Sequence, residues 1–438
     1  EIVRQYMKWD HKLAGYDNAG TVVTRALQVM LSEPRGPAYL ALPREVTMAR
    51  TEMARFPLLD QLQPSITPAP DRQALRQAAE WLLNAEHPLI CASAYGRNAD
   101  AVPALLELAE TIGAPIQGDV FRMTVPGRHP LNAGQAGRGP VPAGTDCLLL
   151  LDVVVPWEPK SFDPSPEARV IRIDLDPAVS MTTMYYEFPC DLPITADTAK
   201  AVPELTEQIR SLMTPEQKRR CEARLETLRA DGQRRHERYI EAAQNDRASG
   251  NITSRWLSHQ LGETLDPETI ITHELCDTSG FNRSLPGTLI GTGGSSIGWA
   301  APAAVGAKVA APDRTVVSAL GDGSWMFGNP QVTSWASKFH QAPVLFVIFN
   351  NRGYRTGTDE VLHSFPEGYA ARNMDLTGGW FDPCPNYSAE AAGSGAFGEK
   401  VTDPDEVAPA IRRGLKAVQE GVPAVLDIWL PKLVTGEV

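Results

Sequence analysis

Two short apolar runs, joined by a single crossover, constrain the fold of this chain most strongly. Residues 315–320 (TVVSAL) and 344–349 (VLFVIF) have the composition of buried parallel strands. Residues 332–340 between them are compatible with a helix, and the interval is long enough for a βαβ crossover. The chain is therefore expected to contain an open parallel α/β sheet.

Polar residues and glycines follow both runs. Gly321, Asp322 and Gly323 come directly after the first run, and an asparagine pair ending at Asn351 follows the second. Because open α/β sheets bind ligands at the carboxyl ends of their strands, Asp322 and Asn351 are expected to share a ligand site. With the backbone carbonyl of Gly353 they form an oxygen set that suits Mg²⁺ shared with a substrate's phosphates. The glycines would let the backbone approach that ligand, although such residues are also common in ordinary turns.

An earlier region shows the same alternation of strands and helices. Its expected elements are strands over 89–94, 147–154 and 170–174 and a helix over 101–112. A charged helix over 214–244, expected to be a solvated face, leads into the last region. The fold class is therefore α/β with doubly wound parallel-sheet domains, and the expected domains cover residues 70–213 and 251–438.

Residues 1–50 have the pattern of the end of a domain. An amphipathic helix is expected over 21–31 and a buried strand over 38–42. One helix and one strand cannot bury their own apolar faces. The rest of this sheet is therefore expected upstream or on another chain.

The pattern GDGS followed by NN resembles the metal and diphosphate signature of enzymes that use thiamine diphosphate, in the acetolactate synthase and benzoylformate decarboxylase branch. Three further stretches resemble that family in order: GPAYLALPREV (36–46), VIRIDLDP (170–177) and GGSSIGWAAPAAVGA (293–307). The resemblance implies a Rossmann-like middle domain and a cofactor-binding last domain. It also implies that residues 1–50 close a pyrimidine-binding domain, and no residue here matches that domain's activating glutamate.

The resemblance assigns roles to residues of both motifs. Asp322, Asn351 and the Gly353 carbonyl would hold Mg²⁺ on the diphosphate of the cofactor. Ile297 matches the bulky apolar residue that wedges the cofactor into a V shape, and the Ser295 carbonyl matches the acceptor of its amino group. The remaining predicted cofactor contacts are Ser296, Gly321, Gly323, Ser324 and Tyr354.

Other residues near the motifs have two interpretations each. Ser324 either contacts a phosphate or caps the helix that follows. His273 and His363 are candidates for proton transfer, because imidazole titrates near neutral pH, or they are structural histidines. Glu274 and Cys276 match a family region on the diphosphate and substrate side. Tyr354 is also a candidate for substrate contact.

Composition argues against several classes of partner. The net charge is −12 and no basic stripe is present, so nucleic acid is not expected. The six cysteines lack the spacing of a zinc site or disulfide framework, which fits a reducing compartment, the cytoplasm or an organelle matrix. No apolar run approaches the roughly 20 residues of a membrane span. The middle domain has no complete phosphate loop, so a scaffold is favoured over a site for FAD or ADP.

The function that this resemblance favours is acetolactate synthase-like carboligation after decarboxylation of a 2-oxo acid, with thiamine diphosphate and Mg²⁺. The alternative is non-oxidative 2-oxo acid decarboxylation of the benzoylformate type. Residues 352–374 depart from the family pattern and leave the acceptor open, and the long segment 352–386 is a candidate lid. The family implies a homodimer or homotetramer. A third interpretation is an incomplete or split-enzyme subunit, inactive alone, whose partner supplies the pyrimidine domain, or a catalytically silent scaffold.

Overall fold

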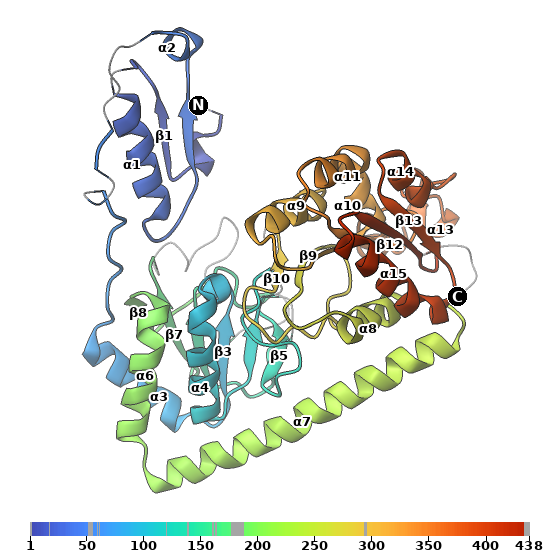
Figure 1. Cartoon of the computed structure of the whole chain (residues 1–438). Helices are drawn as coiled ribbons and strands as arrows, with labels where there is room; N and C mark the ends of the chain where they lie inside the picture. Colours follow the sequence, from blue (N-terminus) through green and yellow to red (C-terminus); the bar gives the residue numbers. More distant parts are fainter. Residues whose placement is uncertain are drawn as a thin grey trace. The chain divides into compact units, whose positions relative to one another are not determined.

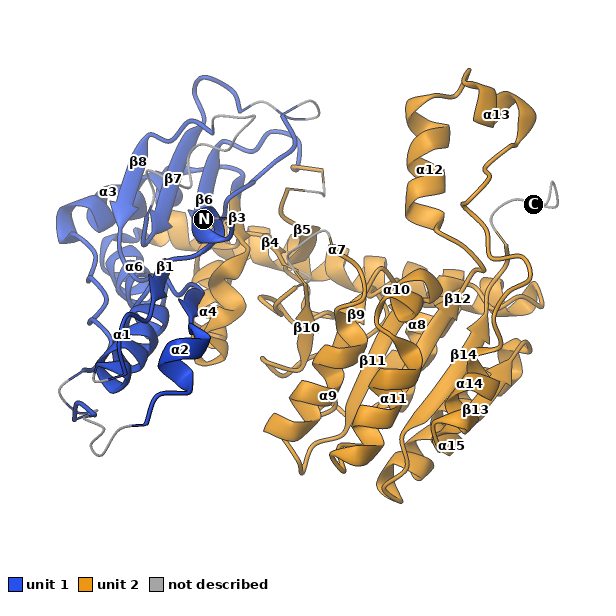
Figure 2. Ribbon diagram, turned by 90° about the horizontal axis from the view of Figure 1, so that it is seen from above, with its two compact units in different colours: residues 1–88, 142–214 blue, residues 89–141, 215–438 orange. Residues whose placement is uncertain are grey.

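The computed structural model describes eleven stretches of the chain: residues 2–16, 18–50, 56–58, 60, 62–119, 121–137, 140–159, 162, 164–176, 188–292 and 296–432. The chain divides into two compact units, one formed by residues 1–88 and 142–214 and the other by residues 89–141 and 215–438 (Figure 2). These units interleave along the sequence, and the expected domain boundaries at 1–50, 70–213 and 251–438 stay predictions.

The second unit contains a six-stranded sheet in which every strand pair is parallel. Its strand order is β10-β9-β11-β12-β14-β13. The strands are β9 (Ile270–Glu274), β10 (Leu289–Gly291), β11 (Val316–Gly321), β12 (Leu345–Asn350), β13 (Phe397–Val401) and β14 (Ala424–Trp429). The prediction of two buried parallel strands joined by a crossover is confirmed, since β11 pairs directly with β12.

Helices cover both faces of this sheet (Figure 1). Alternate residues of each central strand enter two separate apolar clusters, with Val317 and Ala319 in one and Val316 and Leu320 in the other. The first cluster is completed by α8 (Ser254–Thr264) and α15 (Val407–Gln419), and the second by α9 (Ala300–Ala310), α10 (Asp322–Phe327) and α14 (Tyr387–Gly393). Two covered faces are the reason that these strands are apolar without alternation.

The crossover between β11 and β12 contains two helices where one was expected over 332–340. α10 ends at Phe327, and α11 (Pro330–Phe339) begins two residues after Gly328. Asn329 takes a left-handed conformation with φ of 51°, and Pro330 opens α11. Because proline has no amide hydrogen to donate, it starts the second helix and does not continue the first.

The segment expected to be a loop over 352–386 also contains helices. These are α12 (Arg355–Ser364) and α13 (Tyr369–Asn373), which stand away from the sheet in Figure 2. None of their apolar side chains is buried, and those of Val361 and Tyr369 are exposed. Without a buried stripe they carried no apolar periodicity, which is why the sequence pattern missed them.

The earlier region of alternating elements forms two parallel three-stranded ladders, one in each unit. The elements of this region in the second unit are β3 (Pro88–Ala92), α4 (Val102–Ile112), β4 (Ile116–Gly118), β5 (Asn132–Gln135) and the long α7 (Pro215–Ala248). Those in the first unit are α3 (Arg72–Asn84), β6 (Cys147–Leu151), β7 (Arg169–Asp174), β8 (Leu192–Thr195) and α6 (Thr198–Leu212). Only Cys221 and Ala243 of α7 are buried, so its predicted solvated face is confirmed. None of the helices in the described stretches is long and apolar enough to cross a membrane.

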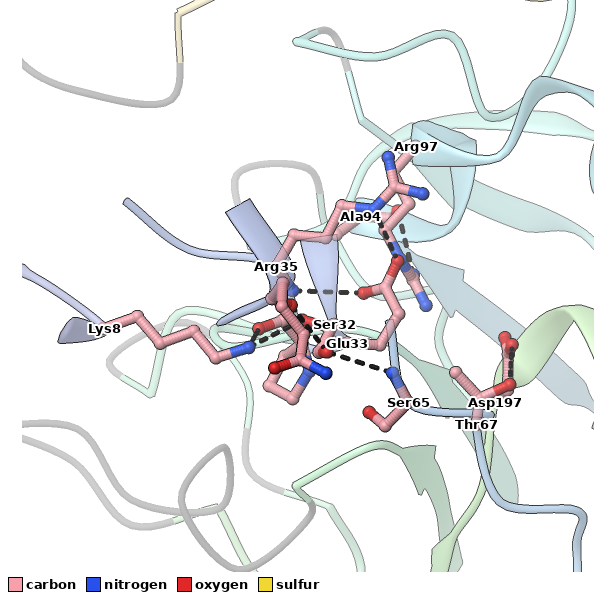
Figure 3. A network of polar contacts seen from close by, with 11 residues as sticks. Lys8, Ser32, Glu33, Arg35, Ser65, Thr67, Ala94, Arg97 and Asp197 are labelled. Atoms are coloured by element: carbon pink, nitrogen blue, oxygen red, sulfur yellow. Dashed lines mark hydrogen bonds and ion pairs between the residues drawn. The ribbon is translucent and has the colours of Figure 1, made fainter. Parts of the chain in front are cut away.

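The N-terminal part of the first unit is a parallel pair of strands beside one helix. It contains β1 (Trp9–Lys12), α1 (Ala19–Leu31), β2 (Ala38–Ala41) and α2 (Arg44–Thr47). The ammonium group of Lys8 donates to the carbonyls of Ser32 and Pro34 at 2.6 and 2.9 Å, and the Ser65 amide donates to the Ser32 hydroxyl at 3.0 Å (Figure 3). The strand β1 was not expected from the sequence.

Short 3-10 helices are η1 (Arg4–Tyr6), η3 (Ala94–Arg97), η4 (Ala99–Ala101) and η5 (Pro404–Glu406).

Candidate functional site

Three neighbouring strands of the six-stranded sheet end at one cavity of about 680 Å³. Glu274 is the last residue of β9, Asp322 directly follows β11, and Asn351 directly follows β12. All three residues line the cavity. The predicted placement of Asp322 and Asn351 at the carboxyl ends of adjacent strands is therefore confirmed.

Asp322 is buried at the start of α10, directly after β11. One carboxylate oxygen accepts a hydrogen bond from the Gly323 amide at 3.0 Å, and the other accepts one from the Gly353 amide at 3.0 Å. The side chain is 1% exposed. Burial raises the pKa of Asp322 to about 6, more than these amide hydrogen bonds lower it. The carboxylate is thus poorly compensated, and a cation in the cavity would stabilise its charge.

Two neutral oxygens near Asp322 are open to such a cation and to the phosphate that would share it. The side-chain oxygen of Asn351 and the hydroxyl of Ser324 are buried, have no hydrogen-bond partner, and belong to cavity-lining residues. Buried polar atoms in proteins are nearly always paired, so unpaired ones indicate a missing ligand or water. One carboxylate with neutral oxygens fits Mg²⁺ shared with phosphate groups. No cluster of three or more histidine, cysteine or acidic side chains suited to a metal occurs within the described stretches.

Ser324 lies inside α10 and not at its start. The residue in the N-cap position is Gly321, and no side chain caps this helix. The interpretation of Ser324 as a helix cap is therefore wrong. Its unpaired hydroxyl leaves phosphate contact as the interpretation that stays open.

The glycines of the motifs are needed for close contacts within the protein. A Cβ added at Gly323 would lie 2.8 Å from the ring of Tyr354, and one added at Gly353 would lie 2.3 Å from the Gly379 carbonyl. Tyr354 also lines the cavity and packs edge-on against Phe381 at 4.8 Å between ring centroids. Glycine at these two positions lets the turns after β11 and β12 approach their neighbours.

Glu274 closes the amino end of α9. Its carboxylate accepts hydrogen bonds from the amides of Gly298, Trp299 and Ala300 at 2.8, 2.9 and 2.9 Å. A carboxylate at a helix N-terminus satisfies otherwise unpaired amides and interacts favourably with the helix dipole. Glu274 thereby anchors the backbone that follows Ile297. Glu274 was expected to face the diphosphate and substrate side. It does line the cavity, but its carboxylate already accepts these three hydrogen bonds from backbone amides of the same chain.

The segment before α9 brings further predicted residues to the cavity. Ser296 is exposed and Ile297 is half-buried, and both line it. Ser295 lies outside the described residues. Ile297 thus lies at a wall of the cavity, and its role as a wedge for the cofactor stays a prediction.

The two candidate histidines are separated by the structure. His273 is 5% exposed on β9 and lines the cavity. His363 lies on the exposed side of α12 and is not among the described residues that line the cavity. Cys276 lines the cavity too, where burial raises the pKa of its thiol and its sulfur donates to the Ala319 carbonyl at 3.3 Å.

The sequence interpretation missed several residues that line the cavity, and three of them are Phe121, Gln135 and Leu275. Phe121 and Gln135 come from the segment before α7, and Leu275 follows Glu274 with a left-handed φ of 49°. The Gly291 amide at the end of β10 donates to the Phe121 carbonyl at 2.9 Å, and this bond docks the segment against the sheet. No local sequence pattern predicts this contact, because Phe121 and Gly291 are far apart in the sequence.

Two family models match the chain. The central domain of thiamine pyrophosphate enzymes matches residues 75–205, and the C-terminal TPP binding domain of thiamine pyrophosphate enzymes matches residues 273–428. The second match contains Glu274, Asp322 and Asn351. Both matches agree with the order of motifs in the sequence.

Curated relatives are similar at low identity. An acetolactate synthase of Mycobacterium leprae is 24% identical over 350 residues, which cover 76% of this chain and 54% of that protein. A sulfoacetaldehyde acetyltransferase of Rhodobacter capsulatus is 23% identical over 457 residues, which cover 97% of this chain and 74% of that protein. The chain thus spans about half the length of the first relative.

Solved structures share the fold. A benzoylformate decarboxylase from Polynucleobacter necessarius superposes with a TM-score of 0.73 at 18% identity, over 98% of this chain and 76% of that one. A 4-hydroxybenzoylformate decarboxylase from Rhodococcus jostii gives a TM-score of 0.73 at 19% identity, over 98% and 77%. The parallel-sheet α/β architecture predicted from the sequence is confirmed by these superpositions.

Proposed function

Because the chain belongs to the thiamine pyrophosphate enzyme family, we propose that its cavity binds thiamine diphosphate with Mg²⁺ and that it acts on 2-oxo acids. The observation that carries the proposal is the set of buried oxygens at the cavity, the poorly compensated Asp322 carboxylate and the unpaired Asn351 and Ser324 oxygens. A divalent cation and a phosphate would satisfy all three. When bound, thiamine diphosphate supplies a nucleophilic carbon for a carbonyl and an electron sink for loss of carbon dioxide.

The chain's own residues bind and orient in this proposal. Asp322, Asn351 and the Gly353 carbonyl hold Mg²⁺, and the Ser324 hydroxyl donates to a phosphate oxygen. Ile297 supports the cofactor from the wall that Glu274 anchors. Of the two candidate histidines we favour His273 for proton exchange, because it lines the cavity, whereas His363 is exposed and is not among the described lining residues.

We favour carboligation after decarboxylation, because two curated relatives are named acetolactate synthase and probable acetolactate synthase large subunit. The second candidate is simple decarboxylation, as the names of the two superposed structures describe. The choice depends on whether an acceptor carbonyl or a proton is captured. The departure of residues 352–374 from the family pattern leaves the acceptor to experiment, and a scaffold role is favoured over FAD or ADP binding for the middle domain.

We further propose that a pyrimidine-binding domain must be completed before turnover occurs. The β1–β2 pair and α1 leave Val23, Leu27, Leu31 and Tyr39 between 45% and 48% exposed. Covering such apolar side chains would gain free energy. Further residues of the same protein or a partner chain would complete this sheet, and a homodimer or homotetramer is the expected assembly. The free cysteines fit a reducing compartment such as the cytoplasm.

The proposal is tested by calorimetric titration of thiamine diphosphate into the purified protein with and without Mg²⁺. Asp322→Ala should weaken Mg²⁺-dependent binding by at least about a hundredfold, because it removes the charged ligand. Asp313→Ala is the matched control, since Asp313 is exposed in the turn before β11. Equal binding by Asp322→Ala and the native chain would overturn the metal assignment.

A second experiment tests whether turnover requires a completed pyrimidine-binding domain. Pyruvate or benzoylformate should give no turnover when this chain is incubated alone with thiamine diphosphate and Mg²⁺. Turnover by the purified chain would contradict the requirement for a completed pyrimidine domain. Product analysis of an active assembly would then separate carboligation from decarboxylation.

A further inference from the structure

The two residues of the asparagine pair have different surroundings. The Asn350 side chain is fully buried and fully engaged: its oxygen accepts from the Arg352 amide at 3.0 Å, and its nitrogen donates to Asp427 at 2.7 Å. The Asn351 oxygen, by contrast, has no partner. Only Asn351 is therefore available to a ligand, and Asn350 serves another purpose.

Asn350 holds a turn in an unfavourable conformation. Arg352 has a φ of 61°, which is uncommon for a residue with a side chain. The bond from its amide to Asn350 fixes that conformation. The next amide along the chain, that of Gly353, donates to Asp322 at 3.0 Å. The side chain of Asn350 thus determines where the turn presents its groups to Asp322.

Asp427 fixes which way the Asn350 amide faces. Both carboxylate oxygens of Asp427 accept hydrogen bonds, one from Asn350 and the other from the Trp429 indole at 3.2 Å. A carboxylate accepts and a backbone amide donates, so the nitrogen of Asn350 must face Asp427 and its oxygen must face Arg352. A reversed amide would lose both bonds.

The position of Asp427 argues against a purely structural role. It is 0% exposed in β14, on the same face as Val425, which belongs to the apolar core. Burying a carboxylate costs free energy, and apolar residues of similar size often stabilise such positions better. The observed contacts of Asp427 lead through Asn350 to the turn that borders Asp322.

We propose that Asp427 is a positioning residue of the candidate metal site, acting through Asn350 on the Asn351–Gly353 turn. The inference rests on the proposed function for its consequence in cofactor binding. Asp427 is in β14 and does not itself border the cavity among the described residues. Its effect is on geometry: it keeps the Gly353 amide on Asp322 and leaves the Asn351 oxygen unpaired.

The first measurement is amide hydrogen exchange in the protein without cofactor, at Arg352 and Gly353. Asp427→Ala and Asn350→Ala should each speed exchange at these two amides at least about tenfold, because the hydrogen bonds that hold the turn are lost. Asp427→Asn should have a smaller effect, since its amide oxygen still accepts from Asn350. Ser318→Ala is the matched control, because Ser318 is a fully buried polar residue of β11 whose hydroxyl lies 3.2 Å from that of Thr272.

The second measurement is Mg²⁺-dependent binding of thiamine diphosphate by the same variants. Asp427→Ala should weaken it about tenfold, and the double variant with Asn350→Ala should be no weaker than Asn350→Ala alone, because both act through one pathway. Unchanged exchange at Arg352 and Gly353 in Asp427→Ala, or in Asp427→Asn and Asn350→Ala if Asp427→Ala does not fold, would overturn the inference whether or not the cofactor binds. Faster exchange in the variants, together with no binding of the cofactor by the native chain, would support the positioning role and overturn the proposed function.

Discussion

Neighbouring strands β9 and β11 lead to two buried carboxylates, Glu274 and Asp322. The two differ in how far hydrogen bonds compensate their charge. The strands pair with Glu274 opposite Leu320, and Asp322 lies two residues beyond Leu320. Glu274 is 3% exposed and receives three amides that open α9. Asp322 is 1% exposed and accepts hydrogen bonds from two amides, that of Gly323 in the first turn of α10 and that of Gly353 after β12, and burial raises its pKa to about 6.

This difference is the one expected between a residue that stabilises the fold and one that binds a ligand. A carboxylate whose oxygens are satisfied by a helix terminus contributes to stability. A carboxylate whose charge is only partly compensated costs stability until a cation arrives. The comparison therefore favours Asp322 over Glu274 as the charged ligand of the proposed metal site.

The largest expected effect is on the Glu274 side of this comparison. Glu274→Ala removes three charge-assisted hydrogen bonds, and we expect the free energy of unfolding to fall by about 3 kcal/mol. Urea denaturation followed by circular dichroism measures this. Glu420→Ala is the control, since Glu420 is 64% exposed and only 3.9 Å from Lys416, a pair worth less than about 0.5 kcal/mol. A loss in Glu274→Ala no larger than in the control would remove the distinction between the two carboxylates.

The opposite sign is expected for Asp322→Asn in the protein without metal. Raising the pKa from 3.8 to about 6 corresponds to a cost of about 3 kcal/mol for the charged form. The amide removes that cost but accepts only one of the two hydrogen bonds well, a loss of about 1 kcal/mol. At pH 8 the variant should therefore be more stable than the native chain by about 2 kcal/mol.

This gain should depend on pH in a defined direction. Between the unfolded pKa of 3.8 and the folded pKa of about 6, the folded state binds more protons than the unfolded state. The contribution of Asp322 to stability therefore falls as pH rises through this window, and is constant above about pH 7. Urea denaturation of both proteins at pH 4 and pH 8 checks the prediction. A stability difference that is the same at both pH values would contradict the assigned pKa.

The smallest expected effect concerns Ser324. Its hydroxyl is buried and unpaired, so Ser324→Ala should change the free energy of unfolding by less than about 1 kcal/mol, with either sign. Mg²⁺-dependent binding of thiamine diphosphate should weaken about threefold to tenfold through loss of one hydrogen bond to phosphate. Ser337→Ala is an informative contrast, because the buried Ser337 hydroxyl donates to the Ala342 carbonyl at 2.6 Å. That variant should lose stability and keep its affinity.

Much of the site was predictable because its residues stand in local patterns. The apolar runs before Asp322 and Asn351 predicted adjacent parallel strands, and adjacency placed both residues at one edge. The helices over 355–364 and 369–373 were not predictable, since their exposed apolar residues form no buried stripe. The lining role of Phe121 was also hidden, because it depends on a backbone bond to Gly291, 170 positions later.

By itself the sequence determined the parallel strands, the polar residues that follow each strand, and the family that these residues indicate. These features depend on residues that are close together in the chain. The tertiary structure alone decided the partners of each polar group. It bound Glu274 to the amides of α9, and it joined Asn350 to Asp427 across 77 residues, which left Asn351 unpaired at the cavity. Strand register and helix docking set those contacts, and both depend on packing between distant segments of the chain.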